Sequence, residues 1–389
     1  MRLLHTSDWH LGRSFHGEDL LAAQAAYVDH LVETVEAEQV DLVIVAGDVY
    51  DRALPPVDAV ALADDAFARL ARSRAQVVVT SGNHDSHRRL GFNSRLVELA
   101  GLHLRTDAGR VDEPVLLTDE HGPVAVYGIP YLEPDVLRHA WDLPARSHQA
   151  VLGHALERIR DDLATRPDGT RSVVVAHAFV AGGLPSDSER EIAVGGVSVV
   201  PVELFAGFDY TALGHLHGRA RLTESVRYCG SPIAYSFSEA RHLKGSWLVD
   251  LDADGLVDTR FVKSPVPRPL ACLSGTLETL LADPDLADAE AAWVQVTLTD
   301  TARPTNAMER LQRRFPHAVA LRFTPAGGPT TPERSPTAGK SAHEISLDFV
   351  DHVRGGPASE AESDLLRLAL ECCSDDPDLV PGRDTVVTR

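Results

Sequence analysis

Aspartate, asparagine and histidine gather in five short clusters of this sequence, each directly after a run of apolar residues. The clusters are Asp8-Trp9-His10, Gly47-Asp48-Val49-Tyr50-Asp51, Gly82-Asn83-His84-Asp85, a single His177 and Gly214-His215-Leu216-His217. Their oxygen and imidazole donors, with no cysteine among them, suit Mn, Fe or borderline Zn. One such cluster alone is more often a helix cap or a surface group. Five of them at predicted strand ends indicate a metal site.

The number of donors indicates how many ions the site holds. Seven ligands are too many for one tetrahedral ion, and they fit two ions about 3.5–4 Å apart that share a bridging carboxylate. In Asp-x-His and His-x-His, the spacing of two places both side chains on one face of an extended strand, so each pair is expected to chelate an ion. The predicted ligands are Asp8, His10, Asp48, Asn83, His177, His215 and His217.

The elements that must position these residues repeat one arrangement. Asp8, Asp48 and Asn83 follow apolar runs and lie 40 and 35 residues apart, which fits successive strand–helix–strand units. Residues 20–38 carry apolar side chains at helical spacing. Continuous apolar strands are typical of sheets buried on both faces. Polar clusters at their carboxyl ends lie where open α/β sheets bind ligands.

Short apolar runs continue in the second half, and together with the first three they predict an α/β fold, a two-sheet sandwich flanked by helices. The pattern breaks at the prolines of 265–269, and a β-α-β-α-β pattern follows with a helix over Met308–Arg314. The predicted divisions are the sandwich over 1–265, a small α+β domain over 270–323, a flexible linker over 324–340, a helical hairpin over 341–374 and a disordered tail over 375–389.

The composition is that of a globular protein, with 44% hydrophobic and 24% charged residues. The net charge of −20 argues against non-specific binding of a polyanion. Part of that charge lies in residues 341–389, and carboxylates that bind a cation are neutralised locally. No run approaches the length of a membrane span, and the N-terminus does not resemble a secretion signal. We therefore expect a cytoplasmic protein with reduced cysteines and no membrane association.

The five clusters, in this order, resemble the calcineurin-like metallophosphoesterases. The segments HTSDWHLGRSFHG, GDVYDRALPP, SGNHDSHRRLGF and YCGSPIAYSFSEA narrow the resemblance to the SbcD family, the nuclease subunits of bacterial SbcCD complexes. It spans about residues 1–265 and continues more weakly through 270–323, which is similar to that family's DNA-facing capping domain. The resemblance implies a Mn-dependent DNA exonuclease and endonuclease in DNA repair, recombination and replication, associated with the nucleoid.

The resemblance also implies roles for individual residues. It places one ion between Asp8, His10 and His217, the other between Asn83, His177 and His215, and makes Asp48 the bridge. In the same pattern His84 faces the scissile phosphate, protonates the leaving oxygen or stabilises the transition state, and is oriented by Asp51. Weaker candidates for contacts with DNA phosphates are Arg13, His16, Arg88, Arg89 and Arg95, and a solvated helix face is an equal alternative for the last three.

The C-terminal segment is predicted to bind a partner protein. Two Ser-x-x-Glu capping boxes, at Ser341 and Ser359, begin two short helices. The resemblance implies an SbcC-like coiled-coil ATPase as the partner, in a heterotetramer that contains a homodimer and acts on DNA ends and hairpins. Packing of the hairpin on the chain's own catalytic domain is the alternative. The apolar stripes expected to make the contact are Ile345, Phe349, Val353, Leu365 and Leu366.

Two further expectations concern nucleotides and dimers. Gly339-Lys340-Ser341 matches the end of a phosphate-binding loop, but Arg334 replaces its first glycine and no strand precedes it, so no nucleotide binding by this chain is expected. Helices near 57–72 and 88–100 are expected to contribute to the dimer. The alternative functions are a small-molecule or protein phosphoesterase on the same scaffold, or a non-catalytic scaffold for an ATPase.

Overall fold

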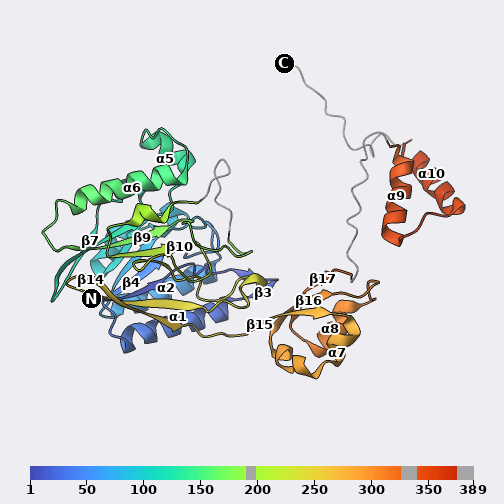
Figure 1. The fold of residues 1–389 in the computed structure, drawn as a ribbon, viewed down its shortest axis with the longest axis horizontal. Helices are drawn as coiled ribbons and strands as arrows, with labels where there is room; N and C mark the ends of the chain where they lie inside the picture. Colours follow the sequence, from blue (N-terminus) through green and yellow to red (C-terminus); the bar gives the residue numbers. More distant parts are fainter. Residues whose placement is uncertain (190–198, 326–339, 375–389) are drawn as a thin grey trace, which may run out of the picture. The chain divides into compact units, whose positions relative to one another are not determined.

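The computed structural model describes residues 1–189, 199–325 and 340–374. Most of the predicted linker, and the whole of the predicted tail, therefore lie outside the described residues. The chain divides into two compact units (Figure 1). The first comprises Met1–Leu273, Leu280–Val296 and Met308–Leu321, and the second comprises Ser274–Thr279, Thr297–Ala307 and the described residues from Arg322 onward.

Two six-stranded sheets form the centre of the first unit, which confirms the predicted sandwich. The first sheet contains, in spatial order, β14 (Gly255–Lys263), β13 (Gly245–Asp252), β1 (Arg2–Thr6), β4 (Leu42–Ala46), β5 (Gln76–Thr80) and β6 (Leu102–Arg105). The second contains β11 (Ala220–Arg221), β12 (Val226–Tyr228), β10 (Tyr210–Gly214), β9 (Arg171–His177), β8 (Gly122–Ile129) and β7 (Val115–Asp119). Strands β1, β4, β5 and β6 run parallel, as do β8, β9, β10 and β12.

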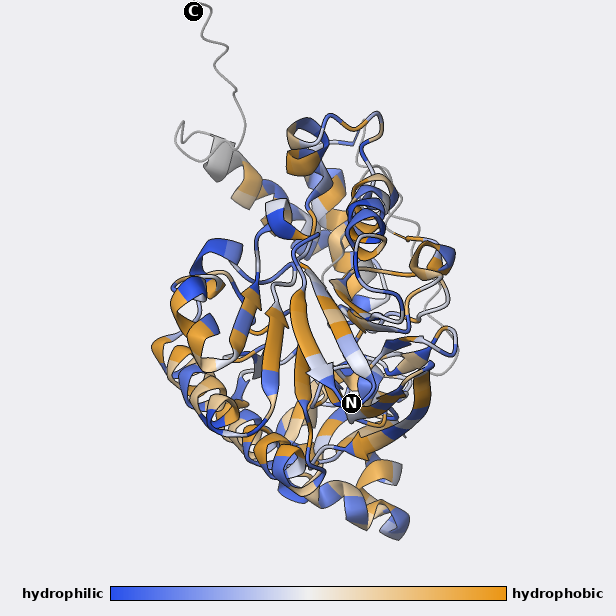
Figure 2. Cartoon of the chain, turned by 90° about the vertical axis from the view of Figure 1, so that its left-hand side faces the viewer, coloured by the Kyte–Doolittle hydropathy of each residue, from blue (hydrophilic) through white to orange (hydrophobic). Residues whose placement is uncertain are grey.

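Side chains that alternate along the strands build three apolar layers. Leu3 and Ile44 of the first sheet meet Val173 of the second in a core shared by the two sheets. Their neighbours along the chain point outward, because successive side chains of a strand lie on opposite faces. These outward residues pack under α1 (Leu21–Ala37) and α2 (Val57–Arg72) on the first sheet, and under α6 (His148–Leu163) on the second. Figure 2 shows the strands as largely hydrophobic and the helices as two-sided.

Shorter elements lie between the main strands and helices along the chain. They include β2 (Ser14–Phe15), β3 (Glu18–Asp19), α3 (His87–Leu90), α4 (Ser94–Val97), α5 (Pro134–Ala140) and the 3₁₀ turns η1 (Glu98–Ala100) and η4 (Phe237–Glu239). The segment after the prolines contains β15 (Leu270–Gly275), α7 (Leu277–Ala282), the 3₁₀ helix η5 (Pro284–Ala291), β16 (Trp293–Leu298), α8 (Ala307–Arg314) and β17 (Ala318–Phe323). This order confirms the predicted β-α-β-α-β pattern, and its three strands form one sheet in the order β15-β16-β17.

Two helices form the predicted C-terminal hairpin, α9 (Ala342–Arg354) and α10 (Glu360–Ser374). Ser341 caps α9, and its side chain and backbone exchange hydrogen bonds with Glu344 in a full capping box. Ser359 and Glu362 make the equivalent bonds at α10. Both predicted helix starts are confirmed. Over the described part of the chain, no helix has the length and apolar character needed to cross a membrane.

Candidate metal centre

The polar clusters meet where the parallel strands of both sheets end. Asp8 and His10 come after β1, which ends at Thr6, and they have φ angles of 53° and 45°. They lie in a turn with left-handed backbone, and the expectation that they share the face of an extended strand is wrong. The loop after β4 holds this turn, because the N–H groups of Asp8 and His10 donate to the carbonyls of Gly47 and Asp48. Likewise His215, with a φ of 105°, follows the end of β10.

Two glycines allow these loops to approach one another. Gly47 has a φ of 82°, and a Cβ atom there would lie 2.3 Å from Nδ1 of His177. A Cβ atom on Gly82 would lie 2.1 Å from Oδ1 of Asp48. Any side chain at either position would push a predicted ligand out of the centre.

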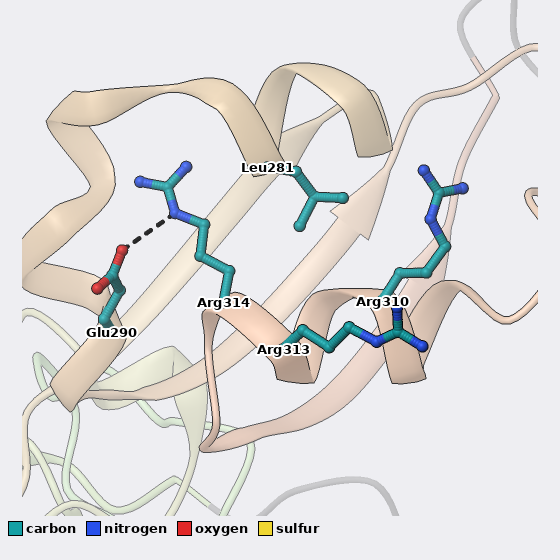
Figure 3. A pocket seen from close by; sticks show the side chains of 5 residues that line it. All are labelled: Leu281, Glu290, Arg310, Arg313 and Arg314. Atoms are coloured by element: carbon teal, nitrogen blue, oxygen red, sulfur yellow. Dashed lines mark hydrogen bonds and ion pairs between the residues drawn. The ribbon is translucent and has the colours of Figure 1, made fainter.

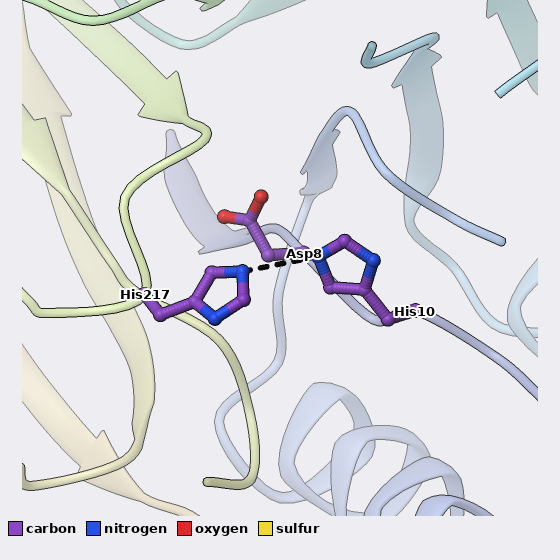
Figure 4. A group of neighbouring side chains, drawn as sticks. All are labelled: Asp8, His10 and His217. Atoms are coloured by element: carbon purple, nitrogen blue, oxygen red, sulfur yellow. Dashed lines mark hydrogen bonds between the residues drawn. The ribbon is translucent and has the colours of Figure 1, made fainter. Parts of the chain in front are cut away.

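Asp8, His10 and His217 form one group of neighbouring side chains (Figure 4). The Nε2 atoms of the two histidines face each other at 3.0 Å. The carboxylate of Asp8 accepts hydrogen bonds from Ser7 and from the main-chain N–H of His215. All three ligand side chains are buried.

Asp48 lies between this group and the second one. Its Oδ2 atom is 3.6 Å from His10 Nε2 and 3.4 Å from His177 Nε2, a position consistent with the predicted bridge. His177 Nε2 also lies 2.9 Å from Asn83 Oδ1. The ring of His215 packs edge-on against that of His177, with centroids 5.3 Å apart. The structure therefore brings all seven predicted ligands together.

His84 lies beside the same cluster, with its ring 4.6 Å from that of His10. Its main-chain N–H donates to Asp48 Oδ1, and its Nδ1 lies 2.7 Å from the main-chain carbonyl of Asp51. The structure differs here from the expected acid–histidine pair, because the backbone of Asp51 makes the contact. The Asp51 carboxylate instead lies 3.7 Å from Arg13 Nε and 3.9 Å from His10 Nδ1.

Burial and charge set the ionisation of the cluster. Burial lowers the pKa of His10 and of His215 well below the usual value, so both rings are neutral and able to coordinate a cation. Burial alone would raise the pKa of Asp48, but the facing His177 holds that pKa well below its usual range. The same attraction overcomes burial and raises the pKa of His177 to about 9. Burial raises the pKa of Asp8 to about 6.

The residues present fit a divalent metal site. Each of three groups of carboxylate and imidazole donors falls within 4.8 Å: Asp8 with His10 and His217, Asp8 with Asp48 and His177, and His10 with Asp48 and His84. The Nε2 atoms of His10 and His217 lie 3.0 Å apart, close enough for both to coordinate one cation. His10 Nδ1 is buried and has no hydrogen-bond partner among the described residues.

The five predicted DNA-contact residues fall into two groups. Arg13 is partly buried, stacks on Tyr235 and donates to the main-chain oxygen of Ser188. Its Nη1 atom is buried without a hydrogen-bond partner within the described parts of the chain. The other four are exposed: His16 lies in the turn between β2 and β3, Arg88 and Arg89 lie in α3, and Arg95 lies in α4.

The sequence interpretation missed two sets of supporting residues. The carboxylate of Asp85 accepts hydrogen bonds from three main-chain N–H groups, those of Val49, Tyr50 and Gly82, and so joins two ligand loops. Burial raises the pKa of this carboxyl to about 7.

The second set is Ser188, Glu239 and Lys244, which surround His217. Burial alone would raise the pKa of Glu239, but Lys244 holds it well below the usual range. Glu239 lies in the quoted segment YSFSEA, and Lys244 is one of three lysines in the chain. That scarcity of lysine was a signal that could have singled it out.

Comparisons with known proteins agree with this geometry. The family model described as "Calcineurin-like phosphoesterase" matches residues 1–219, and "Type 5 capsule protein repressor C-terminal domain" matches residues 266–348. A curated relative, SbcD of the SbcCD nuclease from Staphylococcus epidermidis, is 30% identical over 324 residues, which cover 82% of this chain and 85% of the relative.

Solved structures that match part of the chain include TT1561 of Thermus thermophilus, at 15% identity and a TM-score of 0.39, over 67% of this chain and 99% of that one. A dimetal phosphatase from Danio rerio matches at 15% identity and a TM-score of 0.38, over 68% of this chain and 99% of that one.

The fold and the cluster of carboxylates and imidazoles define a metal-dependent phosphoesterase. The chain belongs to the calcineurin-like phosphoesterase family and, within it, to the SbcD family of nuclease subunits.

Proposed function

We propose that this chain is a Mn²⁺-dependent DNA exonuclease and endonuclease that hydrolyses phosphodiester bonds at a centre of two divalent ions. The observation that carries the proposal is the meeting of seven buried or half-buried donors, Asp48 among them, with His84 beside them. Its similarity to a relative named as part of a nuclease supports DNA as the substrate. We further propose that it acts in the cytoplasm, in DNA end processing, repair and recombination.

Residues of this chain would hold both ions and would supply the proton for the leaving oxygen. Asp8, His10 and His217 would hold one ion, and Asn83, His177 and His215 the other, with Asp48 between them. Bound divalent ions polarise the phosphoryl oxygens and make a water molecule more acidic.

His84 donates a proton to the leaving oxygen in this proposed reaction. Its Nδ1–H donates to the carbonyl of Asp51, so the ring is fixed and its Nε2 is the atom that faces the cluster. Proton donation to the leaving oxygen would therefore take place at Nε2 from the doubly protonated ring, which keeps its Nδ1–H on the Asp51 carbonyl. No side-chain nucleophile is required.

Basic side chains supply contacts for the DNA backbone. We propose that Arg13, with its unpartnered Nη1, contacts a phosphate next to the centre. A second basic surface lies on α8, where Arg310, Arg313 and Arg314 line a cavity of about 500 Å³ together with Leu281 and Glu290 (Figure 3). Arg314 is bound to Glu290, whereas Arg310 is exposed. Phosphate oxygens are the ligands that arginine prefers.

The C-terminal hairpin is proposed to bind a coiled-coil ATPase of the SbcC kind. Phe349, Val353 and Leu365 are each about two-thirds exposed, Ile345 is 37% exposed, and Leu366 is half-buried. Apolar side chains in this number are unfavourable in water unless another surface covers them. ATP use would then belong to the partner.

A homodimer is proposed through a second apolar surface. Val57 and Val60 on α2, and Phe92, Leu96 and Leu99 around α4 and η1, are between 43% and 86% exposed. Sedimentation of wild-type protein and of Leu96→Glu tests this surface. A dimer that persists in the variant would place the interface elsewhere.

Digestion of labelled DNA tests the proposed activity. The purified chain with Mn²⁺ and without nucleotide should cleave linear duplex and hairpin DNA, and should leave a cyclic nucleotide largely intact. The reverse preference would favour the alternative, a small-molecule phosphoesterase. Two bound ions with no cleavage of either substrate would favour the non-catalytic scaffold.

A further inference from the structure

His217 is held at three of its atoms by a polar cluster that the proposed reaction does not use. Its main-chain N–H donates to Glu189 Oε1 at 2.7 Å, and its carbonyl accepts from Lys244 Nζ at 2.8 Å. Its Nδ1 lies 2.6 Å from Ser188 Oγ and 3.4 Å from Glu239 Oε1. We call Ser188, Glu239 and Lys244 the His217 cradle. Each of the three is less than a tenth exposed.

The hydrogen-bond directions in the cradle follow from Lys244, whose ammonium group only donates. Lys244 Nζ contacts Glu239 Oε2, so this carboxylate is an ionised acceptor. Its other oxygen, Oε1, takes the single hydroxyl proton of Ser188. The Ser188 oxygen is then left as an acceptor toward His217, and the imidazole proton must lie on Nδ1. His217 Nε2 is left with a lone pair directed to the metal side.

Two other proposed ligand histidines have no charged cluster of this kind at Nδ1 within the described residues. His177 Nδ1 lies 3.0 Å from the main-chain carbonyl of Ala46, an uncharged acceptor. His10 Nδ1 is buried without a hydrogen-bond partner in the described residues. Partners behind a ligand imidazole fix its tautomer and raise its basicity, and their loss typically costs about 10–100-fold in metal affinity. The cradle therefore supports a proposed ligand of the Asp8–His10–His217 position.

We propose that the His217 cradle holds this ligand in one tautomer and orientation, and so sets the affinity of the Asp8–His10–His217 position for its ion separately from the other position. Ser188, Glu239 and Lys244 are positioning residues in this scheme. The inference rests on the proposed two-ion centre. It adds that disrupting the cradle should release the ion at the Asp8–His10–His217 position before the other ion. Ser188 also accepts from Arg13 through its main-chain oxygen, so the same turn joins the ion position to a proposed phosphate contact.

Three variants of the full chain test the cradle. Ser188→Ala removes the acceptor, Ser188→Thr retains a hydroxyl, and the double variant Glu239→Gln/Lys244→Met removes both charges without leaving one unpaired in the interior. The control is Glu98→Gln, which removes a carboxylate 3.1 Å from a histidine outside the centre, His103.

The readouts are calorimetric titration with Mn²⁺ and the ¹⁵N resonances of the imidazole rings, with no DNA present. We expect Ser188→Ala and the double variant to bind one ion as wild type does and the other about 10–100-fold more weakly. The metal-free His217 ring should change from one tautomer to a mixture. Ser188→Thr and Glu98→Gln should behave as wild type.

Unchanged affinities for both ions in Ser188→Ala and in the double variant would overturn the proposal. Equal weakening of both ions would also overturn it, because it would indicate a general structural role. The outcome is separate from the proposed function. Wild-type protein that binds two ions but cleaves no DNA would refute the proposed nuclease activity. It would not contradict the proposed role of the cradle.

Discussion

At the scale of single residues, His84 and Asp48 have different proposed roles in the centre, although the two residues contact each other. Asp48 faces imidazoles of both ligand groups, within 3.6 Å. His84 is fixed by two hydrogen bonds that leave its Nε2 directed to the cluster, 4.0 Å from Asp48 Oδ2. One residue is suited to hold ions and the other to move a proton, so substitutions should separate the two roles.

Replacing His84 with alanine should preserve the ions and abolish most cleavage. None of the seven proposed ligands is altered, whereas loss of a general acid typically lowers the rate by about 10²–10⁴-fold. Metal content by mass spectrometry and cleavage of labelled duplex measure the two effects. Metal-loaded His84→Ala with wild-type activity would refute the assigned role.

Replacing Asp48 with alanine should remove metal and activity together. The carboxylate lies near one imidazole of each half of the centre, His10 and His177, and its loss also leaves His177 buried without this charge partner. Calorimetric titration with Mn²⁺ should detect no tight binding by Asp48→Ala. Two ions bound with wild-type affinity would show that Asp48 is not the bridge.

At the scale of elements, a buried ion pair ties strands of both sheets together. Arg171, the first residue of β9, contacts Asp119 at the end of β7 and the carbonyl of Asp252 at the end of β13. The amino group of Met1 also lies 2.8 Å from Asp119. The hydrogen bond from Arg171 lowers the pKa of Asp119 well below its usual range.

Asp119→Asn should lower the free energy of unfolding by about 3 kcal/mol near pH 7, because Arg171 is left buried without its partner. The lowered pKa of Asp119 stabilises the folded protein at pH values above the unfolded-state pKa, which is near 4. This stabilisation is lost as the pH falls below that value. The difference between wild type and variant should therefore shrink below pH 4. Urea unfolding measures it, with the surface variant Asp65→Asn as a control expected to lose under about 0.5 kcal/mol. Equal losses in the two variants would contradict the assignment.

The strands and helices could be predicted from the sequence because their apolar periodicity is local. Residues 20–38 were expected to form a helix, and α1 spans Leu21–Ala37. The turn at Asp8 and His10 could not be predicted, since its left-handed backbone depends on hydrogen bonds to Gly47 and Asp48, about forty residues away along the chain.

The cradle of His217 was missed for the same reason. Ser188 and Glu239 are 51 residues apart, and only the tertiary fold makes them neighbours. The seven proposed ligands could be named from the sequence, because metal chemistry restricts which residue types can serve.

At the scale of the whole molecule, the C-terminal hairpin should be separable from the catalytic centre. Deleting residues 341–389 removes none of the proposed ligands, so the truncated chain should bind two ions and retain weak cleavage while losing the ATPase partner. Phe349→Asp should mimic that loss, because an unpaired carboxylate is strongly unfavourable in an apolar interface. Phe349→Leu is the matched control. Co-purification with the partner measures binding, and complexes that form unchanged would place the docking surface elsewhere.

The central claim is that two ions lie between these seven residues, and anomalous diffraction from Mn²⁺-loaded crystals tests it most directly. We predict two anomalous peaks about 3.5–4 Å apart on either side of the Asp48 carboxylate. One peak should lie beside Asp8, His10 and His217, and the other beside Asn83, His177 and His215. A single peak at saturating Mn²⁺, or two peaks away from Asp48, would contradict the account.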